Sequence, residues 1–166
     1  MRMKGSKNGT GLSGSVSNIM KLRLPSLSVN EGVARSAVAA FCAQLDPSAS
    51  ELADIKCAVS EAVTNCIVHA YRETVGEIYI EVSLGINREV RILIRDKGCG
   101  IEDVTVARQP LYTTDREGER SGMGFTVMES FTDAVRVRSQ VGVGTTVELR
   151  KRLSSRRDLP RPDVHA

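Results

Sequence analysis

The sequence predicts an α/β (α+β) fold, a two-layer sandwich in which helices cover one face of a mixed, mostly antiparallel sheet. Two observations predict it. Segments of alternating apolar and polar residues, typical of strands, occur near the start, in the middle and near the end of the chain. Between the first and second of these segments, two long stretches carry apolar residues at helical spacing. This order of elements is typical of helices that segregate to one face of a sheet.

The composition predicts one ordinary globular domain. The chain has 166 residues, of which 41% are hydrophobic and 26% charged, and a net charge of +3, too small to indicate a nucleic-acid partner. We expect a flexible leader at residues 1–18, a folded domain at 19–154 and a flexible basic tail at 155–166. No apolar run approaches the ~18 residues of a membrane span, and no secretory signal is evident. We therefore expect a cytoplasmic protein without membrane contact, whose four separate cysteines are reduced.

The first three predicted elements are a strand and two helices. Residues 18–25, "NIMKLRLP", alternate as a strand does. "SVNE" at residues 28–31 matches a capping box for a helix that runs to about residue 45. "SASE" at residues 48–51 matches a second capping box, for a long helix that runs to about residue 71.

The second half of the domain reads as a hairpin, a loop, a helix and two strands. "EIYIEVSL" at residues 77–84 and "EVRILIRD" at residues 89–96 both alternate, which predicts the hairpin. The polar residues 98–122 then form a loop of a length typical of lids and binding loops. The last three predicted elements are a helix at residues 124–131 and strands at residues 134–140 and 145–153.

Polar residues in the long helix form the first candidate site. In "SEAVTNCIVHAY", Glu61 and Asn65 are four residues apart and share one face, away from the apolar stripe. Taken alone, such a pair is typical of a solvated polar face, so a functional interpretation depends on other motifs. His69 lies one turn further along, and we interpret it as a structural residue.

Two inward-facing polar residues in the strands suggest a ligand pocket. Asp96, in "DKGCG", continues the alternation of a buried strand, so its carboxylate needs hydrogen-bond partners. Gly98 and Gly100 remove side-chain bulk beside it, and a flat ligand with an amino donor, such as adenine, would fit. The alternative is an aspartate that begins a turn. Thr145 also alternates inward, although alone it is only a common strand residue.

A glycine pair opens the short helix. Gly122 and Gly124, in "ERSGMGFTVMES", stand where a helix begins, although glycine disfavours helix by about 1 kcal/mol. Close approach of a ligand to the backbone, or a phosphate at a helix N-terminus, would explain them. The stretch lacks the Gly-Lys-Ser/Thr ending of a P-loop.

Together these motifs resemble those of a known family of nucleotide-binding proteins. Their residues and their order along the chain are similar to those of the Bergerat-type nucleotide-binding fold of gyrase B, Hsp90, histidine kinases and MutL. "SEAVTNCIVHAY", "DKGCGIEDVTVARQPLYTT" and "ERSGMGFTVMESFTD" are more closely similar to the anti-sigma F factors of sporulating bacteria, over about residues 20–153. Members of that family are serine kinases that also sequester a sigma factor.

The resemblance implies ATP and Mg²⁺ as ligands. It assigns Glu61 as the general base for a serine hydroxyl and Asn65 as the protein ligand of the metal. The residues expected to contact the nucleotide are Asn65, Asp96, Gly98, Gly100, Thr113, Thr114, Arg120, Ser121, Gly122, Met123, Gly124, Phe125 and Thr145. For the four lid residues 113, 114, 120 and 121, solvation is an equal alternative, and packing is the alternative for Met123.

The resemblance also implies partners: an anti-anti-sigma protein as phosphorylated substrate, a sporulation sigma factor, and a second copy in a homodimer. Arg35 matches the arginine that contacts both protein partners. By itself it reads as an exposed charge beside the small residues Ser36 and Ala39. One rival is an anti-sigma kinase for a stress sigma factor, although "RQPLYTT" favours the sporulation type. The other is a module that binds ATP only as a conformational ligand, which would not need Glu61.

Overall fold

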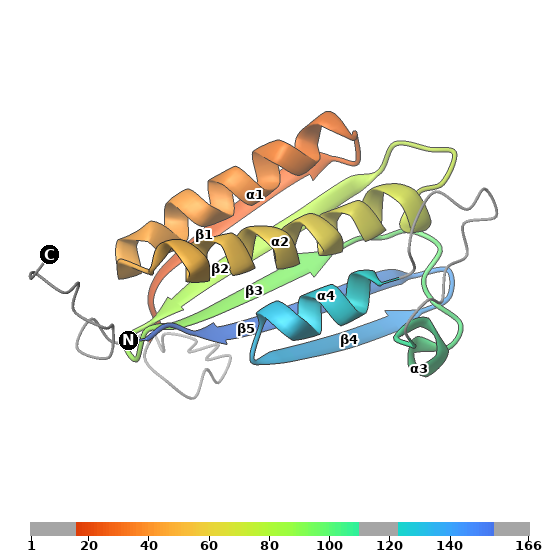
Figure 1. The fold of residues 1–166 in the computed structure, drawn as a ribbon. Helices are drawn as coiled ribbons and strands as arrows, with labels where there is room; N and C mark the ends of the chain where they lie inside the picture. The colour runs from red at the N-terminus through yellow and green to blue at the C-terminus, as the bar shows by residue number, and fades with distance from the viewer. Residues whose placement is uncertain (1–15, 110–122, 155–166) are drawn as a thin grey trace, which may run out of the picture.

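The computed structural model describes residues 16–109 and 123–154. In these residues a five-stranded sheet has the order β1-β2-β3-β5-β4, and each neighbouring pair of strands is antiparallel. Helices α1, α2 and α4 lie side by side over one face of this sheet (Figure 1). The predicted two-layer sandwich is confirmed, with an antiparallel sheet throughout the described part of the chain.

The strands match their predicted positions closely. Their bounds are β1 (Val16–Pro25), β2 (Glu77–Gly85), β3 (Glu89–Arg95), β4 (Ala134–Gln140) and β5 (Gly144–Arg152). Alternate residues of β2 and β3 are buried because they point toward the helices. β1 begins at Val16, inside the segment predicted as a leader, whereas residues 1–15 and 155–166 lie outside the described residues.

The first helix differs from its prediction at the N-terminus. α1 (Val29–Cys42) is followed by a 3₁₀ turn, Ala43–Leu45. Ser28 has helical backbone angles, φ −55° and ψ −35°, and its side chain forms no capping hydrogen bond within the described part of the chain. The N–H of Glu31 instead donates to the carbonyl of Ser28 (3.2 Å), and the Glu31 carboxylate accepts from the hydroxyl of Ser60. The predicted capping box is therefore wrong, because Glu31 is engaged by the neighbouring helix.

The second helix begins as predicted and ends in an unusual turn. In α2 (Ala49–Asn65), the Glu51 N–H donates to Ser48 Oγ (3.2 Å) and the Ser48 N–H donates to Glu51 Oε2 (2.8 Å), which confirms the capping box. The helix continues as a π-helical segment, Cys66–Ala70. Such wide turns are rare and are frequent at functional sites.

One of the last two helices lies inside the predicted loop, and the other follows it. α4 (Gly124–Phe131) has its predicted bounds. α3 (Val104–Ala107) lies inside the segment predicted as loop, so that prediction is wrong there. Oδ1 of Asp103 caps it by accepting from the N–H groups of Thr105 (2.8 Å) and Val106 (3.0 Å). Residues 110–122, the rest of the predicted lid, are outside the described residues.

The core lies between the helices and the sheet. Val38, Ile55, Val59 and Met128 from the helices are fully buried against the inward strand residues. In residues 16–109 and 123–154, no helix is long and apolar enough to cross a membrane. All four cysteines lie in these residues as free thiols, with Cys42 and Cys66 buried.

Candidate functional site

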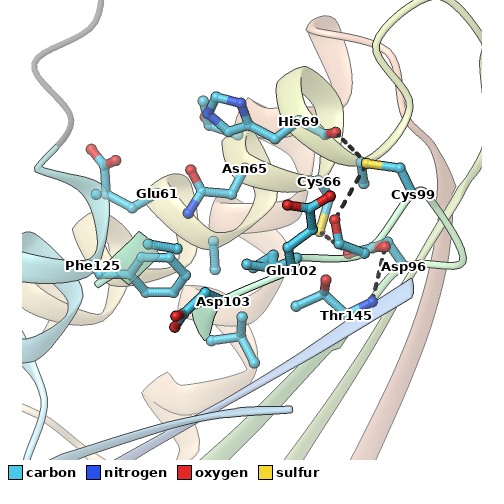
Figure 2. Close-up of a pocket in the computed structure, with 18 of the residues that line it drawn as sticks. Glu61, Asn65, Cys66, His69, Asp96, Cys99, Glu102, Asp103, Phe125 and Thr145 are labelled. Carbon is cyan, nitrogen blue, oxygen red and sulfur yellow. Dashed lines mark hydrogen bonds between the residues drawn. The ribbon is translucent and has the colours of Figure 1, made fainter. Parts of the chain in front are cut away.

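A cavity of about 950 Å³ opens between the end of α2, the start of α4 and the ends of β3 and β5. We call it the main cavity. Most of the predicted site residues that the structure describes lie on its wall, although they come from distant parts of the chain (Figure 2). These residues are Glu61, Asn65, Asp96, Gly100, Met123, Gly124, Phe125 and Thr145.

The α2 wall carries the predicted base and the predicted metal ligand. Glu61 and Asn65 stand on successive turns of α2, and both residues line the main cavity (Figure 2). Each is partly buried, so the pair is not a fully solvated polar face. The end of α2 therefore presents a carboxylate and an amide oxygen to one space.

Gly124 brings the first turn of α4 directly onto these two side chains. A β-carbon at residue 124 would lie 3.0 Å from Oε2 of Glu61 and 3.4 Å from Oδ1 of Asn65. The first of these distances is shorter than ordinary van der Waals contact. The close approach that the glycine permits is thus to Glu61 and Asn65, and it brings the N-terminus of α4 to the cavity.

Asp96 is buried, with 5% of its surface exposed, and it faces the main cavity as predicted. Its Oδ1 accepts hydrogen bonds from the N–H groups of Gly98 (2.9 Å) and Thr145 (3.1 Å). Its Oδ2 accepts from the thiol of Cys66 (3.6 Å). Burial raises the pKa of Asp96, and these donors oppose the rise. The carboxylate is therefore held in a fixed orientation, with Oδ1 fully used.

The two glycines after Asp96 make room for the backbone of other segments. A β-carbon on Gly98 would lie 2.2 Å from the carbonyl oxygen of Ala70, so Gly98 makes room for the π-helical segment. Gly100 has φ +76°, and its β-carbon would lie 2.2 Å from the carbonyl oxygen of Gln140. Gly100 lines the main cavity. Gly98 is not one of the described residues that line it, but its N–H donates a hydrogen bond to Asp96. Both glycines thus make room for backbone, and the clearance for a flat ligand stays a prediction.

Thr145 turns its side chain toward the main cavity, as predicted. Its Oγ1 is 2.8 Å from Oγ of Ser139, which in turn accepts from the N–H of Ile101 (2.8 Å). This chain of contacts joins β5 and β4 to the loop that follows β3. It also fixes the position of the Thr145 hydroxyl beside Asp96.

Several cavity residues were not predicted as site residues. Cys66, Glu102 and Asp103 line the main cavity, and so does His69, which we had interpreted as structural. The carbonyl of His69 accepts from the thiol of Cys99 (3.1 Å), so a structural contact exists as well. The sequence could have indicated Cys66 as a site residue, because Cys66 directly follows Asn65 and belongs to the apolar stripe of the helix that faces the strands. Glu102 and Asp103 lie in a segment without periodicity.

Five predicted contacts lie outside the described residues: Thr113, Thr114, Arg120, Ser121 and Gly122. Met123 is described, and it is 40% exposed at the main cavity instead of packed in the core.

A smaller hollow of about 370 Å³ lies between α1, α2 and α4. We call it the side hollow; it is lined by Arg35, Ser36, Lys56, Cys57, Ser60, Glu61, Val127 and Phe131. Arg35 is half exposed, with Nη1 3.7 Å from Oε1 of Glu31. Ser36 is exposed as predicted, but Ala39 is buried against the core. Glu61 lines both the side hollow and the main cavity.

Comparison with known proteins agrees with this fold. The profile of the histidine kinase-like ATPase domain family matches residues 24–151. The structure of the RsbU and RsbW domains of a Mycobacterium tuberculosis protein superposes with a TM-score of 0.62, at 23% identity over 84% of this chain and 33% of that one. The likeness at this identity is one of fold.

Curated relatives are much closer in sequence. The anti-sigma F factor of Caldanaerobacter subterraneus subsp. tengcongensis is 52% identical over 84% of this chain and 97% of its own length. That of Bacillus subtilis is 52% identical over 86% of this chain and 97% of its own length. Membership of the ATPase domain family means that the chain binds ATP. The chain therefore belongs to the anti-sigma F factor family, kinase-like ATPases that act as anti-sigma proteins.

Proposed function

We propose that the chain transfers the γ-phosphoryl group of ATP to a serine of an anti-anti-sigma protein, and that it also holds a sporulation sigma factor inactive. Anti-sigma F factors are serine kinases of their anti-anti-sigma factor, and this family membership supports the reaction class. The observation that carries our assignment of roles is that Glu61, Asn65 and Asp96 face one cavity.

The polar groups of the main cavity suggest how the nucleotide is oriented. Asp96 and Thr145 form one side of it, while Glu61 and Asn65 lie toward the other (Figure 2). We infer that adenine donates its amino group to Asp96 Oδ2 and that the phosphates lie toward Asn65 and the N-terminus of α4. Free N–H groups and the helix dipole favour anions at such a terminus. The cavity volume is typical of a ligand pocket.

The donor set suits Mg²⁺ held mainly by the nucleotide. Within residues 16–109 and 123–154, no three His, Cys, Asp or Glu side chains gather to hold a metal by themselves. The amide oxygen of Asn65 is a hard donor on the cavity wall, and Mg²⁺ commonly uses few protein ligands together with phosphates and waters. When bound, the ion would neutralise phosphate charge. Asn65 would hold it one turn from Glu61.

In the proposed transfer, Glu61 acts as the general base. Its carboxylate accepts the proton of the serine hydroxyl as the serine oxygen bonds to the γ-phosphorus. The bond from that phosphorus to the bridging oxygen breaks, and ADP leaves. The chain acts mainly by positioning the reacting groups and stabilising their charge, the two effects that dominate catalysis of phosphoryl transfer.

The side hollow offers a route for the protein substrate. Glu61 lines it from one side, and Arg35 and Lys56 also line it. A serine-bearing loop that enters here would reach Glu61 without crossing the main cavity. Two cations at the entrance favour a partner with acidic side chains. Arg35 would then contact the anti-anti-sigma protein, and its exposed guanidinium would also contact the sigma factor when that partner is bound. We also infer a homodimer from the family resemblance, which light scattering tests.

The direct experiment is a phosphorylation assay. The protein is incubated with Mg²⁺, γ-labelled ATP and an anti-anti-sigma protein, beside a variant of that substrate whose acceptor serine is alanine. Label should enter the first substrate and not the second. ATP binding without transfer to any serine would instead support the module that uses ATP only as a conformational ligand.

A further inference from the structure

A buried thiol lies against the carboxylate to which we assign adenine recognition. Cys66 is 4% exposed and lines the main cavity, and its Sγ is 3.6 Å from Oδ2 of Asp96 (Figure 2). A thiol is a weak donor and a carboxylate is an acceptor only, so the direction of the hydrogen bond is from Cys66 to Asp96.

The two oxygens of Asp96 have different surroundings. Oδ1 accepts from two backbone N–H groups, those of Gly98 and Thr145. Each carboxylate oxygen accepts about two hydrogen bonds, so Oδ1 is filled. In the described part of the chain, the Cys66 thiol is the one hydrogen-bond donor to Oδ2. Oδ2 therefore keeps an acceptor position for a ligand on the cavity side.

The local structure holds the thiol in place as a donor. Cys66 directly follows Asn65 and is the first residue of the π-helical segment. An ordinary thiol, with a pKa of about 8.5, is mostly protonated at neutral pH. The contact of Sγ with Oδ2 is therefore a hydrogen bond that Cys66 donates.

We propose that Cys66 is a positioning residue for nucleotide recognition, whose S–H holds Oδ2 of Asp96 in the orientation that accepts the amino group of adenine. The inference rests on the proposed role of Asp96 and adds a second group to it. It predicts that the thiol contributes to the preference for adenine and contributes little to binding of the ribose and phosphates, which lie toward Asn65.

The test compares ATP with purine riboside triphosphate, which lacks the amino group, by calorimetry on the same protein. Cys66→Ala should reduce the ratio of the two affinities about three- to tenfold, the range expected for one hydrogen bond, and leave the affinity for purine riboside triphosphate unchanged. Cys66→Ser keeps a donor and should retain more of the ratio than Cys66→Ala. A partly folded sample lowers both affinities together, so the ratio remains a valid readout.

Cys42→Ala is the matched control, because Cys42 is buried in the same core cluster as Cys66 but does not line the main cavity. It should keep the wild-type ratio. The inference is overturned if Cys66→Ala lowers both affinities equally, or changes neither.

Asp96→Asn separates this inference from the proposed function. The variant keeps an acceptor for Gly98 and Thr145 and places an amide where the adenine amino group would bind. A wild-type ratio in Asp96→Asn would contradict the role of Asp96 itself. Loss of the ratio in Asp96→Asn, with Cys66→Ala unaffected, would overturn the role of Cys66 alone.

Discussion

Gly124, the first residue of α4, stands directly against the carboxylate of Glu61: a β-carbon at residue 124 would lie 3.0 Å from Oε2. A β-carbon there would be closer than ordinary contact, so the Glu61 carboxylate would have to shift by a few tenths of an ångström to admit it. If Glu61 is the base, its position depends on this glycine.

Gly124→Ala should therefore slow phosphoryl transfer by about tenfold or more, since small displacements of reacting groups carry costs of this size. ATP affinity should change less. Gly32→Ala is the control, because a β-carbon at residue 32 in α1 meets no atom within 4 Å. Its transfer rate should be that of the wild type. Equal rates in all three proteins would show that the position of Glu61 does not depend on Gly124.

Asn65→Ala should lose the part of ATP affinity that depends on Mg²⁺, because it removes the proposed protein ligand of the metal. Titrations with Mg²⁺ and with EDTA separate the two parts. In EDTA the variant and the wild type should bind ATP alike. A full Mg²⁺ effect in Asn65→Ala would place the metal ligand elsewhere.

Arg35→Ala should weaken binding of the sigma factor and of the anti-anti-sigma protein together, each by about 2 kcal/mol or more if Arg35 is an interface anchor. ATP affinity should not change. Arg136→Ala is a matched control, since Arg136 is an exposed arginine on β4 and does not line the side hollow. Calorimetry that finds wild-type affinity for both partners in Arg35→Ala would leave Arg35 a solvated charge.

The ion pairs of Glu148, which lie outside the main cavity, should make the stability of the fold depend on pH. A hydrogen bond from Arg91 lowers the pKa of Glu148 to about 2; burial opposes this, and a hydrogen bond from Arg150 supports it. Because the folded pKa lies below the unfolded value of about 4.3, the contribution is complete above that value and is lost as pH falls toward 2. Allowing for solvent screening, it is on the order of 2 kcal/mol.

Urea unfolding of the wild type and of Glu148→Gln at several pH values measures the contribution of Glu148 to the free energy of unfolding. The difference in unfolding free energy between the two proteins should be largest above pH 5 and should shrink as the pH falls below about 4. A difference that does not vary with pH would mean that the ion pairs of Glu148 add no net stability.

Local patterns predicted much of the fold and part of the site. The capping box of Ser48 and Glu51 starts α2, and strict alternation turns Asp96 and Thr145 inward. One failure arose where distant segments meet, because the hydroxyl of Ser60 in α2 engages Glu31. The other is local: a single side chain, Asp103, caps the one-turn helix α3, which is too short for a periodic signal.

The glycines also show that local patterns do not predict contacts between distant segments. Gly98 and Gly100 are required because loop backbone packs against Ala70 and Gln140, residues some 30 to 40 positions away. The contact of Cys66 with Asp96 likewise joins a helix to a strand end. Periodicity indicates which side of an element faces the core, but it does not indicate which two residues meet there.

The most direct test of the account is to measure phosphoryl transfer and ATP binding together in Glu61→Ala. A base acts on the incoming serine hydroxyl and not on bound ATP, so transfer should be abolished while ATP affinity stays close to that of the wild type. A Glu61→Ala protein that phosphorylates the anti-anti-sigma protein at the wild-type rate would contradict the assignment.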